Sequence, residues 1–439
     1  MRDIQNIFIK KKILIYGLGK TGHSSYNFLK KNNETYLYDD NEKIIKNKKI
    51  ERSLINLKDI LKKKFDFILI SPGIDKNKCK LKNYINKNSN KLITDLDVFY
   101  NNYSKNINIT ITGTNGKSTT AKLIYDILKF HKLDVRLTGN IGNPILFEKN
   151  INSQTIFVIE ASSYQIDYSK QFKANYAIIL NISPDHLERH GNMEKYTKSK
   201  CKLFINQNKK DFSFFDFKNK FIKKALKNKK LISKKINVNS SIIQKEMKKI
   251  KNQYFFTNGN KNNLAFIFAL IKILKLKKKI FFKIINNFKG LKYRQQIVFN
   301  SKKITFINDS KATSFSSSLD VLEPLNKVFW IVGGIPKLGD KFLMKKNKYK
   351  NIKAYIFGRN KNYFIKQFKN KIDHEIFYSL EEATRKIIFD IKNIKTNKHK
   401  TVLFSPAAAS FDSFKNFEDR GNKFNIIIKK LNVKKLDYS

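Results

Sequence analysis

The chain has 439 residues, and this length predicts two to four domains with sizeable cores. Its two cysteines, Cys79 and Cys201, exclude a disulfide-stabilised scaffold and predict reduced thiols. No apolar run approaches the ~20 residues that a membrane-spanning helix needs, and the first twelve residues lack the apolar block of a signal peptide. We therefore expect a cytoplasmic protein with no membrane insertion.

The net charge is +55, from 90 Lys and Arg against 35 Asp and Glu. Such an excess is typical of nucleic-acid binders, which concentrate Arg and Lys in one patch with interleaved aromatic residues. Here lysine is spread along the whole chain and arginine is scarce. Lys, Asn and Ile, which AT-rich codons encode, are frequent in every segment. We favour this compositional explanation and expect no nucleic-acid partner. A basic nucleic-acid-binding ATPase is the alternative.

The first predicted block alternates short apolar strands with helices. Residues 12–16 form a strand, a glycine turn follows at 17–22, and a helix continues to about residue 31. Further strands are predicted at 36–38, which ends in two aspartates, and at 65–70. This alternation is typical of a parallel α/β sheet.

The pattern restarts twice. The second block has a strand at 107–112, a glycine loop, and a helix at 119–130, whereas 207–255 is Lys-rich and shows no clear pattern. We expect an α/β protein of three domains: a Rossmann-like domain at 1–103, a central P-loop ATPase-type parallel sheet at 104–290, and a Rossmann-like α/β domain at 291–439. The remaining expected elements are strands at 155–159, 176–180, 303–307, 328–332, 354–357 and 401–404 and a helix at 262–275.

A glycine loop between a strand and a helix carries the strongest chemical signal. Such a loop surrounds one anion with backbone N–H groups and a helix N-terminus. Lys117 is placed to reach the β- and γ-phosphates of ATP, and the Ser118 hydroxyl to ligate Mg²⁺. Ile111 departs from the usual phosphate-loop pattern, which has glycine there. The predicted ATP loop is Gly113-Thr114-Asn115-Gly116-Lys117-Ser118-Thr119.

A second glycine motif, Gly17-Leu18-Gly19-Lys20-Thr21-Gly22, also follows a strand and opens a helix. Asp39 lies about 20 residues further on, as in dinucleotide-binding sites. The motif suits NAD, the diphosphate of a sugar nucleotide, or no ligand. An NAD-dependent dehydrogenase is a third hypothesis, but it leaves the ATP loop unexplained.

Glu160 and His186 follow strands of the same block as the ATP loop. In an open parallel sheet, ligands gather at the carboxyl ends of the strands. A carboxylate there is suited to hold Mg²⁺ together with ATP oxygens. Their joint placement favours a catalytic role for both residues.

These motifs together resemble the Mur ligases, the ATP-dependent amide ligases of peptidoglycan precursor synthesis. The resemblance covers nearly the whole chain. Its last two motifs, Asn308 to Thr313 and Ser405 to Gly421, look like those of the branch that adds D-glutamate. The signatures of the branches that add alanine or a diamino acid are absent. Folylpolyglutamate synthases lack the 17–22 block. The matching runs are 112–119, 137–142, Glu160 to Gln165, Asn181 to Arg189, Asn308 to Thr313 and Ser405 to Gly421.

The resemblance implies a mechanism. ATP phosphorylates the carboxylate of UDP-N-acetylmuramoyl-L-alanine, and the amine of D-glutamate attacks the acyl phosphate. Lys117 neutralises the γ-phosphate. Ser118 and Glu160 hold one Mg²⁺ and His186 serves a second. By resemblance Lys200, one helical turn after Tyr196, carries a CO₂-derived carbamate that binds metal. Lys198 and Lys202 are lesser candidates for that role.

The resemblance also assigns the substrate contacts and implies a monomer. Lys20 and Asn41 stand where the family commonly has an apolar residue and an arginine. Further ATP contacts are expected from Asn260, Asn263, Arg294 and Asp309. D-glutamate contacts are expected from Lys311, Thr313, Lys337, Ser410 and Phe417. Contacts to the UDP substrate are expected from Gly19, Thr21, Gly22, Asp39, Ser71, Pro72, Gly73 and Asn140.

Overall fold

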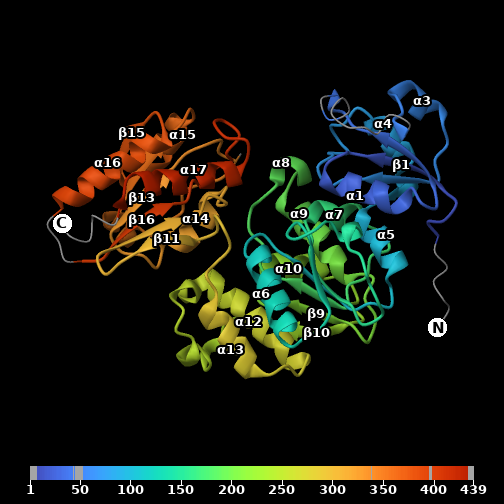
Figure 1. Ribbon diagram of the computed structural model, residues 1–439, viewed down its shortest axis with the longest axis horizontal. Helices are drawn as coiled ribbons and strands as arrows, with labels where there is room; N and C mark the ends of the chain where they lie inside the picture. The colour runs from blue at the N-terminus through green and yellow to red at the C-terminus, as the bar shows by residue number, and fades with distance from the viewer. Residues whose placement is uncertain (1–6, 43, 45–52, 338, 395–397, 434–439) are drawn as a thin grey trace. The chain divides into compact units, whose positions relative to one another are not determined.

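The computed structural model describes residues 7–42, 44, 53–337, 339–394 and 398–433 (Figure 1). These residues form three β-sheets, which lie in two compact units. The first unit comprises Met1–Ile182, His186–Met247 and Asn262–Ile284, and the second comprises Ser183–Asp185, Lys248–Lys261 and Ile285–Ser439. The α/β class with parallel sheets that the sequence predicts is confirmed.

The first sheet has the strand order β2-β1-β3-β4, with every pair parallel. Its inner strand β1 has four buried residues in a row, as expected for a strand covered on both faces. The strands are β1 (Lys12–Tyr16), β2 (Glu34–Tyr38), β3 (Phe67–Ile70) and β4 (Leu92–Ile93). The helices are α1 (Lys20–Leu29), α3 (Leu57–Lys62), α4 (Lys82–Lys87), η2 (Ser89–Lys91) and α5 (Asp95–Asn102).

The second sheet has the order β10-β9-β8-β5-β7-β6 and is also wholly parallel. All five residues of β5 are buried, so this strand lies at the centre of the core. The strands are β5 (Asn108–Thr112), β6 (Val135–Gly139), β7 (Ile156–Glu160), β8 (Tyr176–Ile179), β9 (Phe212–Phe215) and β10 (Lys234–Asn237). The helices up to β9 are α6 (Lys117–Phe130), η3 (Ile145–Phe147), α7 (Ser163–Tyr168), α8 (Leu187–His190), α9 (Met193–Cys201) and η4 (Lys202–Phe204). Those after β9 are α10 (Lys220–Leu226), α11 (Ser241–Gln244), η5 (Met247–Lys249), η6 (Gln253–Phe256), α12 (Asn258–Ile273) and α13 (Lys278–Asn287).

Helix α5 joins these two sheets within the first unit. Its buried Asp97 carboxylate accepts hydrogen bonds from the Ser169 hydroxyl (2.7 Å) and from three successive backbone N–H groups at residues 170–172. The neighbouring Asp95 carboxylate accepts from the Gln165 amide at 3.2 and 3.3 Å. The four hydrogen bonds that Asp97 accepts from the second sheet's segment make α5 a firm link between the two sheets.

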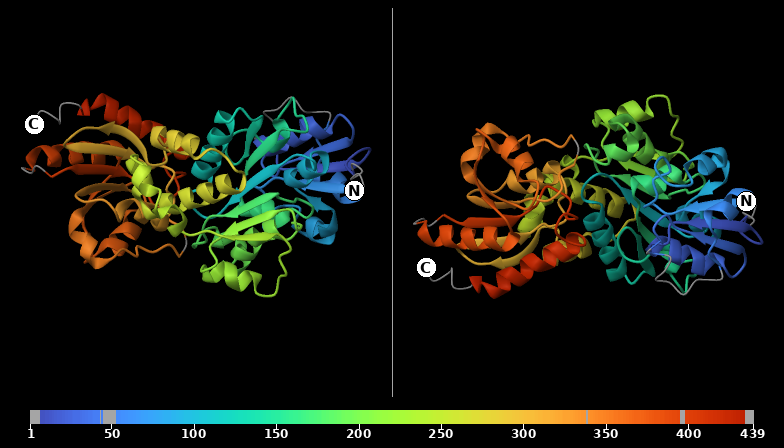
Figure 2. Two further views of the ribbon diagram at one scale, coloured as in Figure 1. Left: turned by 90° about the horizontal axis from the view of Figure 1, so that it is seen from below. Right: turned by 90° about the horizontal axis from the view of Figure 1, so that it is seen from above.

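The third sheet, in the second unit, has the order β11-β12-β16-β13-β14-β15. Only the β11–β12 pair is antiparallel. Helices α16 and α17 pack on one face, against Phe329 and Ile331, and α14 and α15 pack on the other, against Trp330 (Figure 2). The strands are β11 (Gln296–Asn300), β12 (Ile304–Asn308), β13 (Val328–Val332), β14 (Ile352–Phe357), β15 (Asp373–Phe377) and β16 (Lys400–Phe404). The helices are α14 (Phe315–Leu322), η7 (Lys346–Asn351), α15 (Lys361–Phe368), α16 (Leu380–Asn393) and α17 (Phe417–Lys430).

Across the described ranges, the helices are each too short or too polar to cross a membrane.

Candidate nucleotide and metal site

The glycine loop connects β5 to α6, as the sequence predicts. Gly113 and Gly116 have φ values of 147° and 83°, which favour glycine. A Cβ at Gly116 would lie 2.3 Å from the side chain of Asn263, one of the expected ATP contacts. From the end of β8, Asn181 holds the loop: its backbone carbonyl accepts from Thr114 N–H (3.0 Å) and its side chain from Asn115 N–H (2.8 Å). The loop is thus a preformed cradle.

Lys117 begins α6 and its ammonium lies inside the loop. Its Nζ donates to the backbone carbonyls of Gly113 (2.9 Å) and Thr114 (2.7 Å). The cation is therefore held by neutral acceptors at the N-terminus of a 14-residue helix, whose dipole also favours an anion. This arrangement suits a polyphosphate.

Ser118 and Glu160 meet beside the loop. The Ser118 hydroxyl donates to Glu160 Oε2 at 2.5 Å, and both side chains are buried. Glu160 ends β7, the strand that pairs with β5, so the two oxygens come from adjacent elements. A hydroxyl and a carboxylate are the hard oxygen ligands that Mg²⁺ prefers, and this pair fits the ion together with phosphate oxygens. Among the described side chains, no group of three or more His, Cys, Asp or Glu residues gathers to hold a metal without such oxygens.

Lys200 on α9 is one of the few buried lysines, with 2% of its surface exposed. Its Nζ donates to the Gly113 carbonyl (2.9 Å) and to the Thr112 hydroxyl (3.3 Å), directly behind the loop. The Tyr196 hydroxyl, one turn earlier, lies 3.0 Å from that of Thr114. The two lesser candidates point elsewhere: Lys198 pairs with Glu194 and Lys202 with Asp167, both on the surface. Of the three lysines, only Lys200 lies at the ATP loop.

His186 precedes α8 with a left-handed backbone (φ 57°), and its ring lies edge-on to Tyr164 at 5.0 Å. Its Nδ1 is 3.6 Å from the Glu188 carboxylate. A second histidine, His190, stacks on the same Tyr164 ring and meets the Ser163 hydroxyl at 2.9 Å. Burial lowers the pKa of His190 to about 4, so this imidazole is neutral.

The second glycine motif opens α1, at the carboxyl end of β1. The Asp39 carboxylate accepts from Leu18 N–H at 2.6 Å, and the Ser71 hydroxyl donates to the Gly17 carbonyl at 2.6 Å. A Cβ at Gly22 would lie 1.9 Å from the Gly17 carbonyl oxygen, so this position requires glycine. Of the expected UDP-substrate residues of the first sheet, Gly19, Thr21 and Gly22 belong to this motif, and Ser71, Pro72 and Gly73 to the loop bonded to it. Asp39 directly follows β2 and bonds to the turn.

Asn140 differs from this group because it lies at the carboxyl edge of the second sheet. It follows β6, and its backbone N–H donates to the Glu160 carbonyl at 3.0 Å. A Cβ at the preceding Gly139 would come within 2.2 Å of the same carbonyl, so the backbone must approach closely here. Asn140 is thus beside the Ser118–Glu160 pair.

In the second unit, Asp309 follows β12 and is buried. It accepts from the Ser405 hydroxyl (2.9 Å) and from Gln295 N–H (3.1 Å), next to the charge of Arg294. Burial raises the pKa of Asp309 to about 7 in spite of these donors. Asn260, although on α12 with Asn263, bonds to the Tyr254 carbonyl (2.7 Å) and to Gln295 (2.9 Å). The structure therefore gives the two expected ATP contacts on this helix different neighbours.

Two of the expected D-glutamate residues meet: the Lys311 ammonium lies 3.8 Å from the centre of the Phe417 ring. Ser410 is buried, and Lys337 is ion-paired with Asp185. Thr313 comes just before Ser314, the N-cap of α14. The fully buried Arg420 donates to Ser310 (2.7 Å) and Ala408 (2.9 Å) carbonyls and so fixes the segments that carry this set. Burial lowers the pKa of Arg420 to about 10, which leaves it cationic.

Asn181, Arg189 and Arg420 lie within the motifs that the sequence shows, but their roles were not predicted. Each is a side chain that bonds to backbone atoms of another segment. Their occurrence inside the recognised motifs was the available signal. What they hold in place depends on long-range contacts, which the spacing of residues does not reveal.

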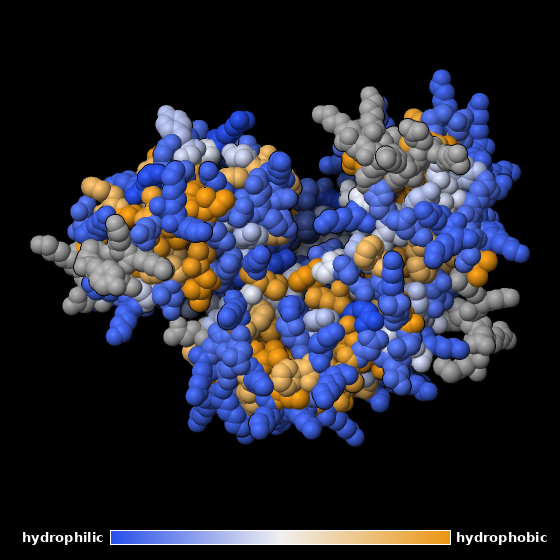
Figure 3. Space-filling view, in the orientation of Figure 1, coloured by the Kyte–Doolittle hydropathy of each residue, from blue (hydrophilic) through white to orange (hydrophobic). Residues whose placement is uncertain are grey.

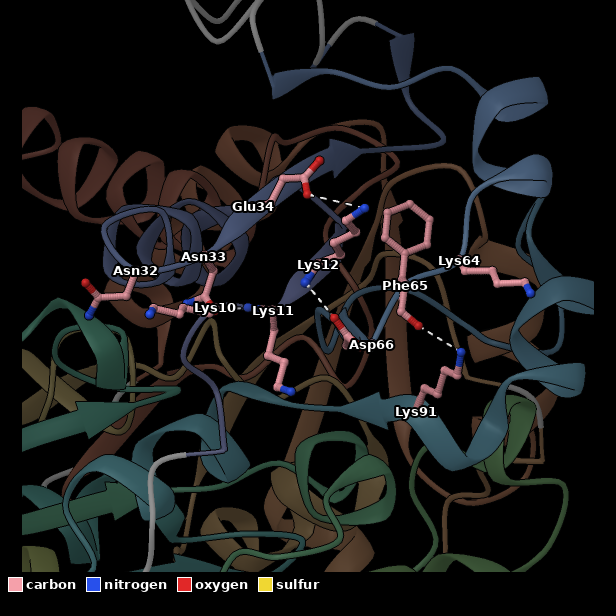
Figure 4. Close-up of a pocket in the computed structure, with 10 residues that line it drawn as sticks. All are labelled: Lys10, Lys11, Lys12, Asn32, Asn33, Glu34, Lys64, Phe65, Asp66 and Lys91. Carbon is pink, nitrogen blue, oxygen red and sulfur yellow. Dashed lines mark hydrogen bonds and ion pairs between the residues drawn. The ribbon is translucent and has the colours of Figure 1, made fainter.

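Hydrophilic side chains are spread over the face that Figure 3 shows, with hydrophobic patches between them. The pocket of Figure 4, about 760 Å³, lies at the amino ends of β1, β2 and β3 and is lined by five lysines and two acids, Glu34 and Asp66. That ratio, 2.5 to one, matches the 90 to 35 of the whole chain, about 2.6 to one. The pocket is therefore no more cationic than the composition requires.

Comparison with known proteins supports one family. Residues 111–277 match the Mur ligase middle domain, and residues 11–92 match the Mur ligase MurD-like N-terminal domain. The UDP-N-acetylmuramoylalanine–D-glutamate ligase of Rickettsia prowazekii is 36% identical, over 95% of this chain and 98% of the relative. The ligase of the same name from Buchnera aphidicola is 32% identical, over 97% and 99%.

Solved structures agree with the fold. The UDP-N-acetylmuramate–alanine ligase of Thermotoga maritima has a TM-score of 0.55 at 16% identity and covers 97% of this chain and 100% of its own. The MurF ligase of the same organism, solved with ADP, has a TM-score of 0.56 at 14% identity and covers 98% and 100%. From the two domain matches and relatives of this identity over nearly the full length, the chain belongs to the Mur ligase family.

Proposed function

We propose that this protein joins D-glutamate to UDP-N-acetylmuramoyl-L-alanine with conversion of ATP to ADP and phosphate, in cytoplasmic peptidoglycan precursor synthesis. The observation that carries the proposal is the convergence of Lys117, Ser118, Glu160 and Lys200 on one glycine loop. The D-glutamate ligases among its relatives, similar over nearly the whole chain, support the choice of substrates.

The reaction has two steps. A carboxylate oxygen of the UDP substrate attacks the γ-phosphorus of ATP, the bond to the bridging oxygen breaks, and ADP leaves. The neutral amine of D-glutamate then attacks the acyl carbon, and a tetrahedral adduct loses phosphate and a proton to give the amide. Lys117 stabilises the charge that builds up on the transferring phosphoryl group, and the loop amides orient it.

Ser118 and Glu160 are the proposed ligands of one Mg²⁺, and His186 of a second. Mg²⁺ supplies positive charge that offsets the repulsion between ATP and an incoming carboxylate. Lys200 is the proposed site of a CO₂-derived carbamate. A bare ammonium behind the loop would repel a metal ion, whereas a carbamate is a carboxylate-like ligand.

The Lys200 assignment is tested by substitution and rescue. Lys200→Ala should lower kcat at least about a hundredfold, and added acetate or formate should restore part of the activity. The matched control is Lys198→Ala, two residues away and exposed, which should retain activity. Loss of activity without rescue would contradict the carbamate.

The remaining assignments place the substrates. Asn260, Asn263, Arg294 and Asp309 contact ATP. Lys311, Thr313, Lys337, Ser410 and Phe417 bind D-glutamate, whose two carboxylates need cations and hydroxyl donors. Gly19, Thr21, Gly22, Asp39, Ser71, Pro72, Gly73 and Asn140 bind the UDP substrate. We also propose a monomer of three domains, 1–103, 104–290 and 291–439, which correspond to the three sheets.

An oxygen-transfer experiment tests the acyl-phosphate route. With ¹⁸O in the carboxylate of the UDP substrate, each released phosphate should carry one labelled oxygen. Unlabelled phosphate would contradict direct phosphorylation of the carboxylate. ATP turnover that depends on DNA or RNA, with a steep salt dependence, would instead favour the nucleic-acid-binding alternative.

A further inference from the structure

Arg189, on α8 of the first unit, links the two sheets of that unit. One guanidinium nitrogen donates to the Pro72 carbonyl at 2.7 Å, and the other donates to the carbonyl of Ile74 and to the Tyr168 hydroxyl at 3.1 Å. The guanidinium carbon lies 3.8 Å from the centre of the Tyr164 ring. The side chain thus reaches from the second sheet to the loop that follows β3.

This loop is joined to the second glycine motif. Ser71 donates to the Gly17 carbonyl at 2.6 Å, and Ile74 N–H returns to the Ser71 carbonyl at 3.0 Å. Lys76 N–H also contacts the Tyr168 hydroxyl at 3.5 Å. A continuous series of hydrogen bonds therefore runs from α8, three residues after His186, to the turn at Gly17.

The chemistry of the contact requires arginine. Its planar guanidinium donates in two directions to backbone carbonyls while one face lies on an aromatic ring. A lysine ammonium keeps the charge but is a point donor and cannot stack in this way. The α5 link, through Asp95 and Asp97, and a shared hydrophobic core join the two sheets elsewhere, so Arg189 is a further attachment, directed at the 71–74 loop.

We infer that Arg189 is a positioning residue that fixes the 71–74 loop against the segment bearing His186, and so holds the UDP substrate in register with the ATP loop. This inference rests on the proposed function, which assigns Ser71, Pro72 and Gly73 to that substrate. Arg189 acts on the loop itself, whereas the two sheets as a whole are already joined by a shared hydrophobic core. The acceptor carboxylate then reaches the phosphate loop at a fixed place.

The test combines amide exchange with steady-state kinetics on the full chain. Arg189→Lys should speed amide exchange at residues 73–76, measured without ligands, about tenfold, because the loop loses its anchor. In the ligase assay the same variant should raise the KM for the UDP substrate about tenfold or more and leave the KM for ATP unchanged. Tyr168→Phe removes one acceptor of Arg189. It should raise the exchange rate at residues 73–76 and the KM for the UDP substrate, each by less than Arg189→Lys does. Arg385→Lys, at an exposed pair with Glu381, is the control and should change neither.

The outcomes are separable. Unchanged exchange and an unchanged KM in Arg189→Lys would overturn the inference. An equal rise in the KM values for ATP and the UDP substrate would also overturn it, because it would indicate general loss of structure. If the unmodified protein released no phosphate on addition of D-glutamate, the proposed function would fail, whereas the exchange measurement would still decide whether Arg189 anchors the loop.

Discussion

The two glycine turns of the first unit share one arrangement of strand, turn and helix, but the backbone of each bonds to a side chain of opposite charge. Each turn follows an inner strand of a parallel sheet, β1 or β5, and opens a helix, α1 or α6. At the first turn, the carboxylate of Asp39, which follows β2, accepts a hydrogen bond from the backbone N–H of Leu18. In the second an ammonium, Lys117, donates to the loop carbonyls, and a second lysine, Lys200, lies behind it.

This difference separates two kinds of nucleotide contact. A resident carboxylate repels a phosphate and favours hydroxyl and N–H donors, such as those of a nucleoside. A resident ammonium attracts phosphate. The 17–22 turn therefore suits the nucleoside part of a ligand, and the 113–119 loop suits a polyphosphate.

The largest predicted effect concerns the lysine of each turn. Lys117→Ala should lower kcat by about a thousandfold or more, because the phosphoryl group loses a charge-assisted contact in the transition state. Lys20→Ala, at the corresponding place in the first turn and exposed, is the matched control and should change kcat less than about threefold. Phosphate release measures both. A similar loss in the two variants would break the comparison.

The second prediction concerns the negative charge of Asp39 at the first turn. Asp39→Asn keeps an acceptor for Leu18 N–H but removes the negative charge, and should raise the KM for the UDP substrate about thirtyfold while the KM for ATP is unchanged. Steady-state kinetics with each substrate varied in turn checks this. Tighter binding of the UDP substrate would mean that a phosphate occupies the first turn, contrary to the comparison.

The smallest effect concerns Asp95 in the link between the two sheets. Burial raises its pKa from 3.8 to about 6, so the folded protein favours the neutral acid. Its contribution to stability is complete below about pH 4 and is lost as the pH rises through 6. Between about pH 5 and pH 8 the free energy of unfolding should fall by about 1 kcal/mol more in the unmodified protein than in Asp95→Asn. Urea unfolding at both pH values measures this difference. Identical pH dependence would contradict a protonated Asp95.

The inner strands could be predicted from the sequence because burial on both faces leaves continuous apolar runs, as in β1, β5 and β13. Most edge strands were missed: β4, β6, β10, β11 and β15 all lie at the edges of their sheets, and β10 and β15 carry charged residues. The edge strand β2 was predicted, whereas the inner strand β9, within the Lys-rich 207–255 segment, was missed. An edge strand is exposed on one side and often charged, so its pattern resembles that of a loop.

In the candidate site too, residues next to buried apolar strands could be predicted, and residues placed by tertiary contacts could not. Lys117, Ser118 and Glu160 lie next to apolar strands, and the structure brings them together as expected. Lys200 could be selected among many lysines only through its motif, and its burial against Gly113 is a tertiary contact. The different neighbours of Asn260 and Asn263 were beyond prediction, because two residues three apart on one helix differ only in what packs against them.

The most direct test of the central proposal is the release of phosphate from ATP in the presence of UDP-N-acetylmuramoyl-L-alanine, with and without D-glutamate. We predict that D-glutamate triggers release of one phosphate for each amide formed, and that L-glutamate, L-alanine and diamino acids do not. Release that is independent of D-glutamate, or amide formation with another of these amino acids instead, would contradict the account.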